Sequence, residues 1–164
     1  MILGFAHPAL VVSDLEKARD FYEKMFGFRY FCDEGWSDNP DVDRLIGVDG
    51  SACRGYTLAG HNCYIELFEF SAPHQTAAVP RELGPHEQGI RHLCFHVDDC
   101  RSEYLRFLDL GGEALGEPVD IGGGIYVVYC RDPFGNIIEL AEMPTAAEDP
   151  CNLPGVNKLG DYRG

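Results

Sequence analysis

Four side chains that could hold a metal ion occur at equivalent places in two halves of the chain: His7 and His92, and Glu66 and Glu139. Neutral imidazoles and carboxylates form a mixed nitrogen and oxygen ligand set, which suits Zn, Ni, Mn, Co or Fe(II). Because a carboxylate buried without a partner is costly, two acids at equivalent strand positions predict a shared cation. A single strand histidine is most often only hydrogen-bonded within a core, so it is the repetition that favours one divalent metal ion per site.

The repetition is visible when His7 is aligned with His92. Each histidine begins a β-type run, HPALVVSD in the first copy and HLCFHVDD in the second. Apolar residues at helical spacing follow in both copies, over residues 14–26 and about 99–110, and each stretch is followed by glycine. The first helix is expected to open with a capping box, SDLE, in which Ser13 is the N-cap.

Both copies end in the same kind of strand, CYIEL with Glu66 and NIIEL with Glu139. Side chains alternate between the two faces of a strand, so the apolar neighbours of each glutamate pack under the helix and the glutamate projects from the other face. The same alternation places His7 and His92 on the face away from the helices. We therefore predict an α+β fold of two paired βαβββ modules. They form a curved mixed-sheet cup, with the helices outside and the four ligands within the cup.

The two modules are predicted to make a single domain, residues 1–143. Module one spans residues 4–70 and module two spans residues 90–143. Residues 71–89 contain three prolines and little periodicity, which is typical of a linker. Residues 144–164 also contain three prolines and are expected to form an extended C-terminal tail.

Four further residues are candidates for binding a substrate in the cup: His96, Tyr64, Phe68 and Trp36. Alternation places His96, Tyr64 and Phe68 on the same strand faces as the predicted ligands. A packed histidine and an aromatic core are alternatives that the sequence leaves open. Trp36 is the only tryptophan, and it lies in an acidic, turn-rich insertion, residues 33–50, which is expected to be a loop or a lid over the site.

Composition narrows the function classes. The chain has 27 acidic and 13 basic residues, a formal net charge of −14, which disfavours nucleic acid and anionic membrane surfaces as partners. The seven cysteines form no CxxC pair, so free thiols in a reducing compartment are expected. The first residues lack the cationic region of a signal peptide, and no apolar run is long enough to span a membrane. We expect a cytoplasmic protein that acts on a small molecule.

Three segments of the chain carry a resemblance to known proteins: HPALVVSDLEKARDFYEKMFGF and GIRHLCFHVDD at the starts of the two modules, and RDPFGNIIELAE at the end of the second. They resemble the vicinal oxygen chelate superfamily, which includes glyoxalase I, methylmalonyl-CoA epimerase, extradiol dioxygenases, and the fosfomycin and bleomycin resistance proteins. The resemblance spans residues 4–143, and its most specific motif is DP-x-G-x-x-x-EL at residues 132–140. It implies the paired βαβββ fold and, because family members commonly dimerise, a homodimer.

The resemblance also maps the family's ligand positions onto the same two histidines and two glutamates. A glutamate at position 66 favours the branch of glyoxalase I and methylmalonyl-CoA epimerase, in which a divalent metal stabilises an enediolate while a carboxylate moves a proton. The implied activity is that of a metal-dependent lyase, isomerase or epimerase acting on a small oxygen-chelating substrate. Glu139 is the first choice for the base and Glu66 the second. Two alternatives stay open here: an Fe(II)-dependent dioxygenase of the same superfamily, and a non-catalytic binding protein of the resistance type.

Overall fold

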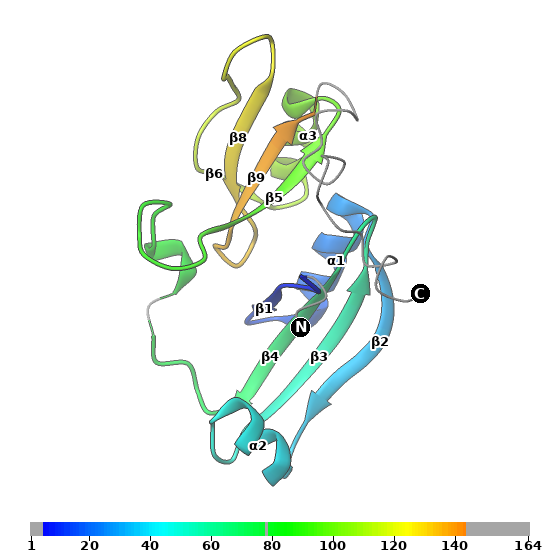
Figure 1. Cartoon of the computed structure of the whole chain (residues 1–164), viewed down its shortest axis with the longest axis vertical. Helices are drawn as coiled ribbons and strands as arrows, with labels where there is room; N and C mark the ends of the chain where they lie inside the picture. Colours follow the sequence, from blue (N-terminus) through cyan, green and yellow to red (C-terminus); the bar gives the residue numbers. More distant parts are fainter. Residues whose placement is uncertain (1–4, 78, 144–164) are drawn as a thin grey trace. The chain divides into compact units, whose positions relative to one another are not determined.

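The structure of the chain is a computed structural model that describes residues 5–77 and 79–143 (Figure 1). The predicted C-terminal tail, residues 144–164, lies outside the described residues. Two compact units make up the chain. The first unit contains residues 7–83 together with the turn 133–135, and the described part of the second unit contains residues 5–6, 84–132 and 136–143.

The first unit is built on a four-stranded sheet in the order β1-β4-β3-β2. Strand β1 runs parallel to β4, and the other pairs are antiparallel. Its elements are β1 (Ala9–Val11), α1 (Leu15–Phe26), β2 (Arg29–Trp36), α2 (Pro40–Ile46), β3 (Ala52–Ala59), β4 (Tyr64–Ala72) and the short 3₁₀-helix η1 (Pro80–Glu82). The predicted order βαβββ is confirmed, with α2 as an additional helix between β2 and β3.

The second unit repeats this plan. Its elements are β5 (His92–Val97), α3 (Cys100–Asp109), β6 (Glu113–Ala114), β7 (Val119–Asp120), β8 (Tyr126–Arg131) and β9 (Ile137–Glu142). The sheet order is β5-β9-β8-β6, with β7 also paired to β8, and β5 runs parallel to β9. The α+β class with two βαβββ modules is therefore confirmed. A cup common to both modules stays a prediction.

Each helix packs on one face of its own sheet, as the alternation predicts. On β4, Ile65 and Leu67 are 1% and 0% exposed, and on β9 Ile138 and Leu140 are both 0% exposed. Full burial of one such side chain stabilises the fold by roughly 1.5–3 kcal/mol. In both strands the glutamate between the buried pair is not buried, which leaves it on the opposite face of the sheet.

The helix starts differ by one residue from the prediction. The N-cap of α1 is Asp14, not Ser13, and the Asp14 carboxylate accepts a hydrogen bond of 2.9 Å from the backbone N–H of Lys17. The second unit does the same, because Asp99 caps α3 and accepts a bond of 3.0 Å from the N–H of Ser102. A carboxylate caps a helix as well as a hydroxyl does and adds a favourable interaction with the helix dipole.

The expectation of a loop over residues 33–50 is wrong. Strand β2 continues through Trp36, and helix α2 follows it. The side chain of Asn39 caps α2 by accepting from the N–H groups of Asp41 and Val42, Pro40 occupies the first turn, and Gly47 ends the helix at φ 71°. These are strong start and stop signals, and they define a short helix where composition alone indicates a loop.

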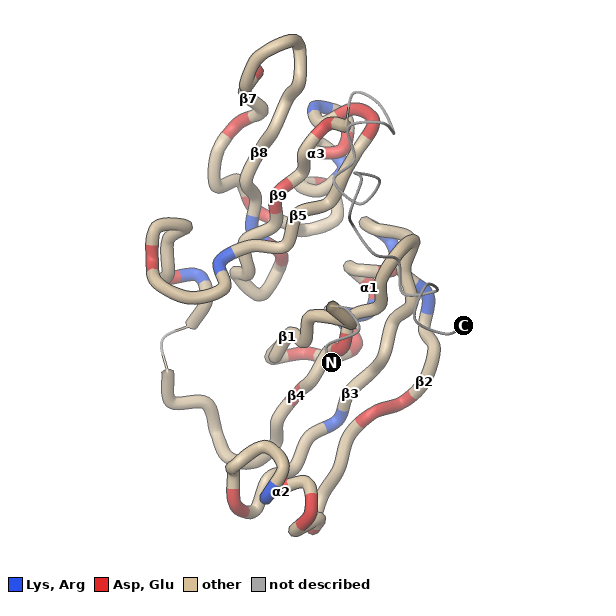
Figure 2. Tube along the Cα trace, viewed as in Figure 1, with Lys and Arg blue, Asp and Glu red and all other residues tan. Residues whose placement is uncertain are grey.

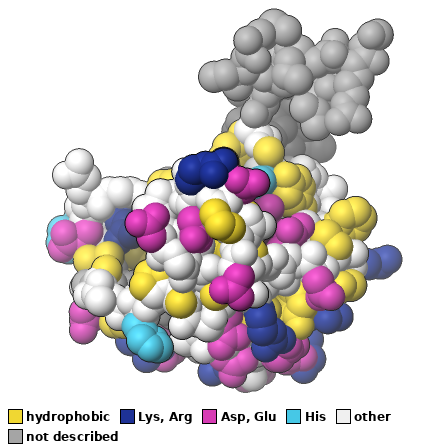
Figure 3. Space-filling view, turned by 90° about the horizontal axis from the view of Figure 1, so that it is seen from below, with side chains coloured by type: hydrophobic (Ala, Val, Ile, Leu, Met, Phe, Trp, Pro, Cys, Tyr) yellow, Lys and Arg dark blue, Asp and Glu magenta, His cyan; other side chains and the backbone are white. Residues whose placement is uncertain are grey.

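Charge is spread over both units, as the tube in Figure 2 shows. On the face seen in Figure 3, acidic and basic side chains are interspersed and apolar side chains occur in small groups. Among the described cysteines, Cys53, Cys100 and Cys130 are buried, and all six are free thiols, as predicted. In the part of the chain that the structure describes, no helix is long and apolar enough to cross a bilayer.

Candidate metal and substrate site

The first unit brings His7 and Glu66 together. Parallel pairing of β1 with β4 sets Ala9 beside Glu66, and the backbone N–H of Glu66 donates a 3.1 Å bond to the carbonyl of Pro8. The Nε2 atom of His7, two residues before β1, then lies 3.1 Å from Oε2 of Glu66. The two side chains are 28% and 22% exposed, so a cation or a ligand can reach them. The His7 ring also packs on Tyr64, with 4.5 Å between the ring centroids.

The second unit contains an equivalent pair. Nε2 of His92, the first residue of β5, lies 3.0 Å from Oε2 of Glu139 on β9, and the side chains are 37% and 18% exposed. The His92 ring packs on Tyr129, with a centroid distance of 5.1 Å. The prediction that each histidine shares a sheet face with its glutamate is thus confirmed within each unit.

The surroundings of Glu139 are richer in hydrogen-bond donors than those of Glu66. Cys94 on β5 and Tyr129 on β8 are the register partners of Glu139. Burial of the phenol, followed by the Glu139 charge and a hydrogen bond to that carboxylate, raises the pKa of Tyr129. Removal of water from around the sulfur, followed by the Glu139 charge and a hydrogen bond, raises the pKa of the Cys94 thiol to about 11, although the residue as a whole is exposed. Both groups therefore stay neutral beside the Glu139 carboxylate at neutral pH.

The two pairs have the donor chemistry and the spacing of metal ligands. Nitrogen and oxygen ligands bind metals such as zinc at about 2.0–2.2 Å, so two neighbouring ligand atoms of one ion lie about 3 Å apart. The pairs at 3.1 and 3.0 Å match that spacing. In addition, Nδ1 of His7 is buried and has no partner among the described residues, so the interaction that fixes this ring is made through Nε2.

Neither pair is a complete metal site by itself. Within each unit, the described residues contain no cluster of three His, Cys, Asp or Glu side chains placed as metal ligands. The predicted centre with four protein ligands would require both pairs. The convergence of His7, Glu66, His92 and Glu139 on one ion stays a prediction.

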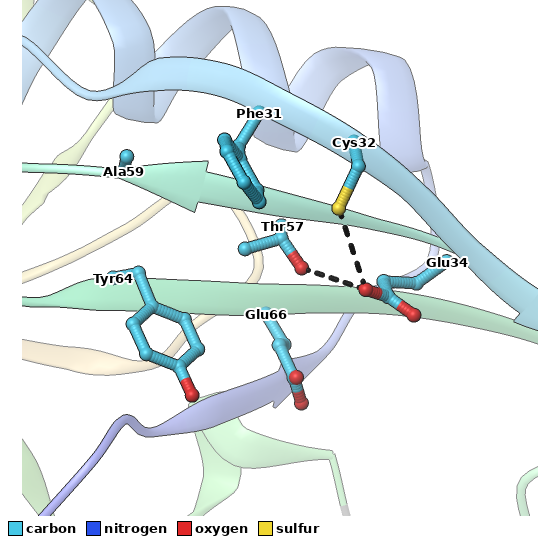
Figure 4. A pocket seen from close by; sticks show the side chains of 7 residues that line it. All are labelled: Phe31, Cys32, Glu34, Thr57, Ala59, Tyr64 and Glu66. Atoms are coloured by element: carbon cyan, nitrogen blue, oxygen red, sulfur yellow. Dashed lines mark hydrogen bonds between the residues drawn. The ribbon is translucent and has the colours of Figure 1, made fainter.

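A pocket opens on the sheet of the first unit beside Glu66 (Figure 4). We call it the β2–β4 pocket. Its volume is about 380 Å³, and its lining residues are Phe31, Cys32, Glu34, Thr57, Ala59, Tyr64 and Glu66. Small-molecule sites commonly measure about 300–1,000 Å³, so the pocket has the size of a site for a compact ligand. Register explains the lining, because Cys32, Thr57 and Glu66 are successive partners across β2, β3 and β4.

A β-bulge shapes the outer wall of this pocket. Tyr30 pairs with Leu58 and Cys32 pairs with Thr57, which leaves Phe31 as the extra residue of β2. A bulge places consecutive side chains on one face of a sheet. Accordingly, both Phe31 and Cys32 line the pocket, and Phe31 is 71% exposed (Figure 4).

The four predicted substrate-binding residues lie in three places. Tyr64 lines the β2–β4 pocket. Trp36 and Phe68 lie farther along the same sheet and pack on each other with a centroid distance of 5.7 Å. His96 lies in the second unit, exposed on the β5 face that carries His92. The structure thus brings Tyr64 to Glu66 within one pocket and adds five pocket residues that the sequence analysis missed: Phe31, Cys32, Glu34, Thr57 and Ala59.

Known proteins resemble the chain along most of its length. A 2-epi-5-epi-valiolone epimerase from Actinomyces sp is 31% identical over 150 residues, which cover 86% of this chain and 80% of the relative. A lactoylglutathione lyase from Escherichia coli O157:H7 is 28% identical over 83% of this chain and 90% of its own. Among solved structures, a glyoxalase family protein from Bacillus cereus has the same fold, with a TM-score of 0.78 at 24% identity over 87% of this chain and 95% of that one.

The family assignment follows from the coverage of these matches and from the repeated module that the structure contains. The family model for the Glyoxalase/Bleomycin resistance protein/Dioxygenase superfamily matches residues 4–140, nearly the whole described chain, and the chain therefore belongs to that superfamily.

Proposed function

We propose that the chain is a divalent-metal-dependent enzyme that moves a proton on a carbon next to a carbonyl group, in an isomerisation or epimerisation. The observation that carries this proposal is the repeated His–Glu pair, with a nitrogen to oxygen distance of 3.1 Å in one unit and 3.0 Å in the other. The superfamily includes epimerases and lyases, and the relative that is 31% identical is named as an epimerase. Epimerisation is therefore the reaction we favour.

His7, Glu66, His92 and Glu139 would hold the metal, one imidazole and one carboxylate from each unit. When bound, the cation supplies a Lewis acid that stabilises negative charge developing on a substrate oxygen. The metal could be Zn, Ni, Co, Mn or Fe, since all of them accept such a mixed ligand set.

We assign the proton transfer to Glu66, which reverses the order of preference that the sequence suggested. Glu66 lines the β2–β4 pocket, and the described residues give its carboxylate one side-chain partner, His7. Glu139 pairs with His92 and has Cys94 and Tyr129 as its neighbours on the adjacent strands, whose pKa values its charge helps to raise. A base must reach the proton that it removes, and a carboxylate that borders a ligand-sized pocket meets that requirement. Glu66 takes the proton from the substrate carbon and releases it to solvent, and reprotonation of that carbon on its opposite face completes the epimerisation.

The test is exchange of a substrate C–H with deuterated solvent, followed by NMR. The metal-reconstituted protein is incubated in D₂O with 2-epi-5-epi-valiolone and, separately, with the hemithioacetal of methylglyoxal and glutathione. We expect metal-dependent deuterium incorporation into one of them, and its loss in the Glu66→Gln variant. Glu117→Gln is the matched control, because Glu117 is an exposed acid in the β6–β7 connection of the second unit.

Two results would overturn the proposal. One is the absence of exchange in both substrates with metal-loaded protein. The other is oxygen consumption with a catechol substrate under Fe(II) reconstitution in place of exchange, which would identify a dioxygenase of the same superfamily.

A further inference from the structure

We propose that Glu34 determines substrate specificity, and that the β2–β4 pocket selects a neutral ring compound bearing hydroxyl groups. This inference rests on the proposed function, because it names the class of substrate that the same site would take. It depends on the position of Glu34, on the absence of a cationic side chain from the pocket lining, and on the apolar side chains that surround the carboxylate.

The Glu34 carboxylate is oriented by two donors on the pocket wall. The Thr57 hydroxyl donates a bond of 3.0 Å to Oε1, and the Cys32 thiol donates a longer one of 3.5 Å to the same atom. Figure 4 shows both bonds meeting at one oxygen, with Glu66 on the same side of the sheet. No side chain in the described residues donates to Oε2 of Glu34, so this oxygen can accept from a ligand.

An acceptor in this place requires a donor from the ligand. An ionised carboxylate has no proton to give, so it pairs with hydroxyl or amine groups and repels phosphate and carboxylate groups. The lining contains two acids, Glu34 and Glu66, and no Lys, Arg or His. No side chain in the pocket wall would compensate an anionic ligand group placed away from the proposed metal.

The remaining wall favours a neutral ring over an ammonium group. Phe31, Ala59 and Tyr64 offer apolar and aromatic surface, against which the C–H faces of a ring can pack. An ammonium carries three donors and needs several acceptors when it loses water. Glu66 is paired with His7 through Oε2 and is proposed to bind the metal, which leaves Oε2 of Glu34 as the carboxylate oxygen that the ligand can use away from the metal. One acceptor among apolar walls matches one hydroxyl group of a ring.

The experiment measures binding without turnover, so it is independent of the proton chemistry. Ligand-detected NMR titrations use a panel of neutral inositol stereoisomers, the monophosphate of each, and an aminodeoxy-inositol. We expect one or more neutral inositols to bind wild-type protein at least about tenfold more tightly than the monophosphate or the amine. Glu34→Gln should weaken the neutral ligand about tenfold, because a charged acceptor is replaced by a neutral one.

Reversing the charge at position 34 is the more decisive test. Glu34→Arg should abolish the preference for the neutral compound and raise the affinity for the monophosphate. Asp33→Asn is the matched control, because Asp33 is the next acid on β2 and does not line the pocket. Thermal unfolding checks that each variant is folded.

The inference is overturned if no neutral inositol binds, if the monophosphate or the amine binds wild-type protein more tightly, or if Glu34→Gln binds as wild type does. The outcomes for the two proposals are separable. Neutral-ligand binding that depends on Glu34, without deuterium exchange, would remove the proposed reaction and leave the pocket. Deuterium exchange that Glu34→Gln leaves unchanged would keep the proposed reaction and remove the proposed role of Glu34.

Discussion

The His7–Glu66 pair and the His92–Glu139 pair have the same spacing but different neighbours. In the register of the sheets, Glu66 is flanked by Ala9 and Thr57, whereas Glu139 is flanked by Cys94 and Tyr129. The Thr57 hydroxyl turns to Glu34 and not to Glu66, while the two partners of Glu139 both interact with its carboxylate. The two units therefore share the His–Glu pair but differ in the side chains around it.

The difference suggests that the two carboxylates have different roles. Glu66, with a pocket beside it and one partner, can exchange a proton with a ligand. Glu139 pairs with His92 and lies between Cys94 and Tyr129, so we propose that its neighbours orient it as a metal ligand. Four changes test this asymmetry and the framework around it.

The largest effect is expected at Glu66. Glu66→Gln keeps the shape of the side chain but removes its basicity, so the rate of solvent exchange should fall by roughly 10²–10⁴-fold. Glu139→Gln should act mainly on the affinity for the metal, and saturating metal should restore more of its activity. The measurement is exchange rate against metal concentration for both variants. An equal loss of exchange rate in both variants at saturating metal would contradict the different roles of Glu66 and Glu139.

The next largest effect is expected from removing the hydroxyl of Tyr129, the β8 neighbour of Glu139. Tyr129→Phe should lower metal affinity by about tenfold or more, as is usual when a partner of a metal ligand is removed. Thr57→Val changes the equivalent register position of the first unit and should leave metal affinity unchanged, since Thr57 bonds Glu34. Competition with a chromogenic chelator measures both. A larger loss of metal affinity in Thr57→Val than in Tyr129→Phe would show that the first unit, and not the second, supports its glutamate through this register position.

A smaller effect is expected at Gly55, the register partner of Phe68 on β4. A methyl group at position 55 would stand 2.6 Å from Cδ1 of Phe68 and 2.9 Å from the carbonyl oxygen of Leu67, so side chain and backbone must both shift. Gly55→Ala should cost about 1–3 kcal/mol in the free energy of unfolding. Gly116→Ala is the control, because a methyl group there has no neighbour closer than 4.0 Å. Urea unfolding compares the two, and equal stabilities would argue against close packing at Gly55.

The smallest effect concerns the link between Trp36 and α2. The indole N–H of Trp36 donates a 2.7 Å bond to the Ser51 hydroxyl, which in turn donates to Asp43. The hydrogen bond from the Ser51 side chain, with further bonds from the backbone of Ser51 and Gly50, lowers the pKa of Asp43 below its ordinary value of 3.8. A lowered folded-state pKa contributes stability above the unfolded-state pKa, and that contribution is lost as the pH falls through the folded-state pKa.

The matching variant is Asp43→Asn. Between pH 6 and pH 2, its stability should decline less than that of wild type, while Asp49→Asn, a nearby exposed acid, should follow wild type. Thermal unfolding across this pH range measures the difference. Parallel curves for Asp43→Asn and wild type would show that the Ser51–Asp43 contact does not stabilise the ionised carboxylate.

The sequence was informative where one regular pattern decides the structure. Strict alternation along β4 and β9 correctly placed Glu66 and Glu139 opposite their buried neighbours, and the repeat correctly paired each glutamate with a histidine. The pocket could not be derived in this way. Its wall depends on the bulge at Phe31, which breaks the alternation of β2, and on a register between β2 and β3 that is set across an inserted helix. The choice between Glu66 and Glu139 as the base stays a proposal, because the repeat makes the two equivalent and they differ only in the side chains of neighbouring strands.

The most direct test of the account is elemental analysis of the protein purified without chelators or immobilised nickel, alongside a variant with both His7→Ala and His92→Ala. We predict one divalent metal ion per chain in the wild-type protein after reconstitution, and substantially less than one in the double variant, with both proteins folded. A wild-type chain that takes up no metal, or a double variant that retains a full equivalent, would contradict the central claim that the two His–Glu pairs form a metal site.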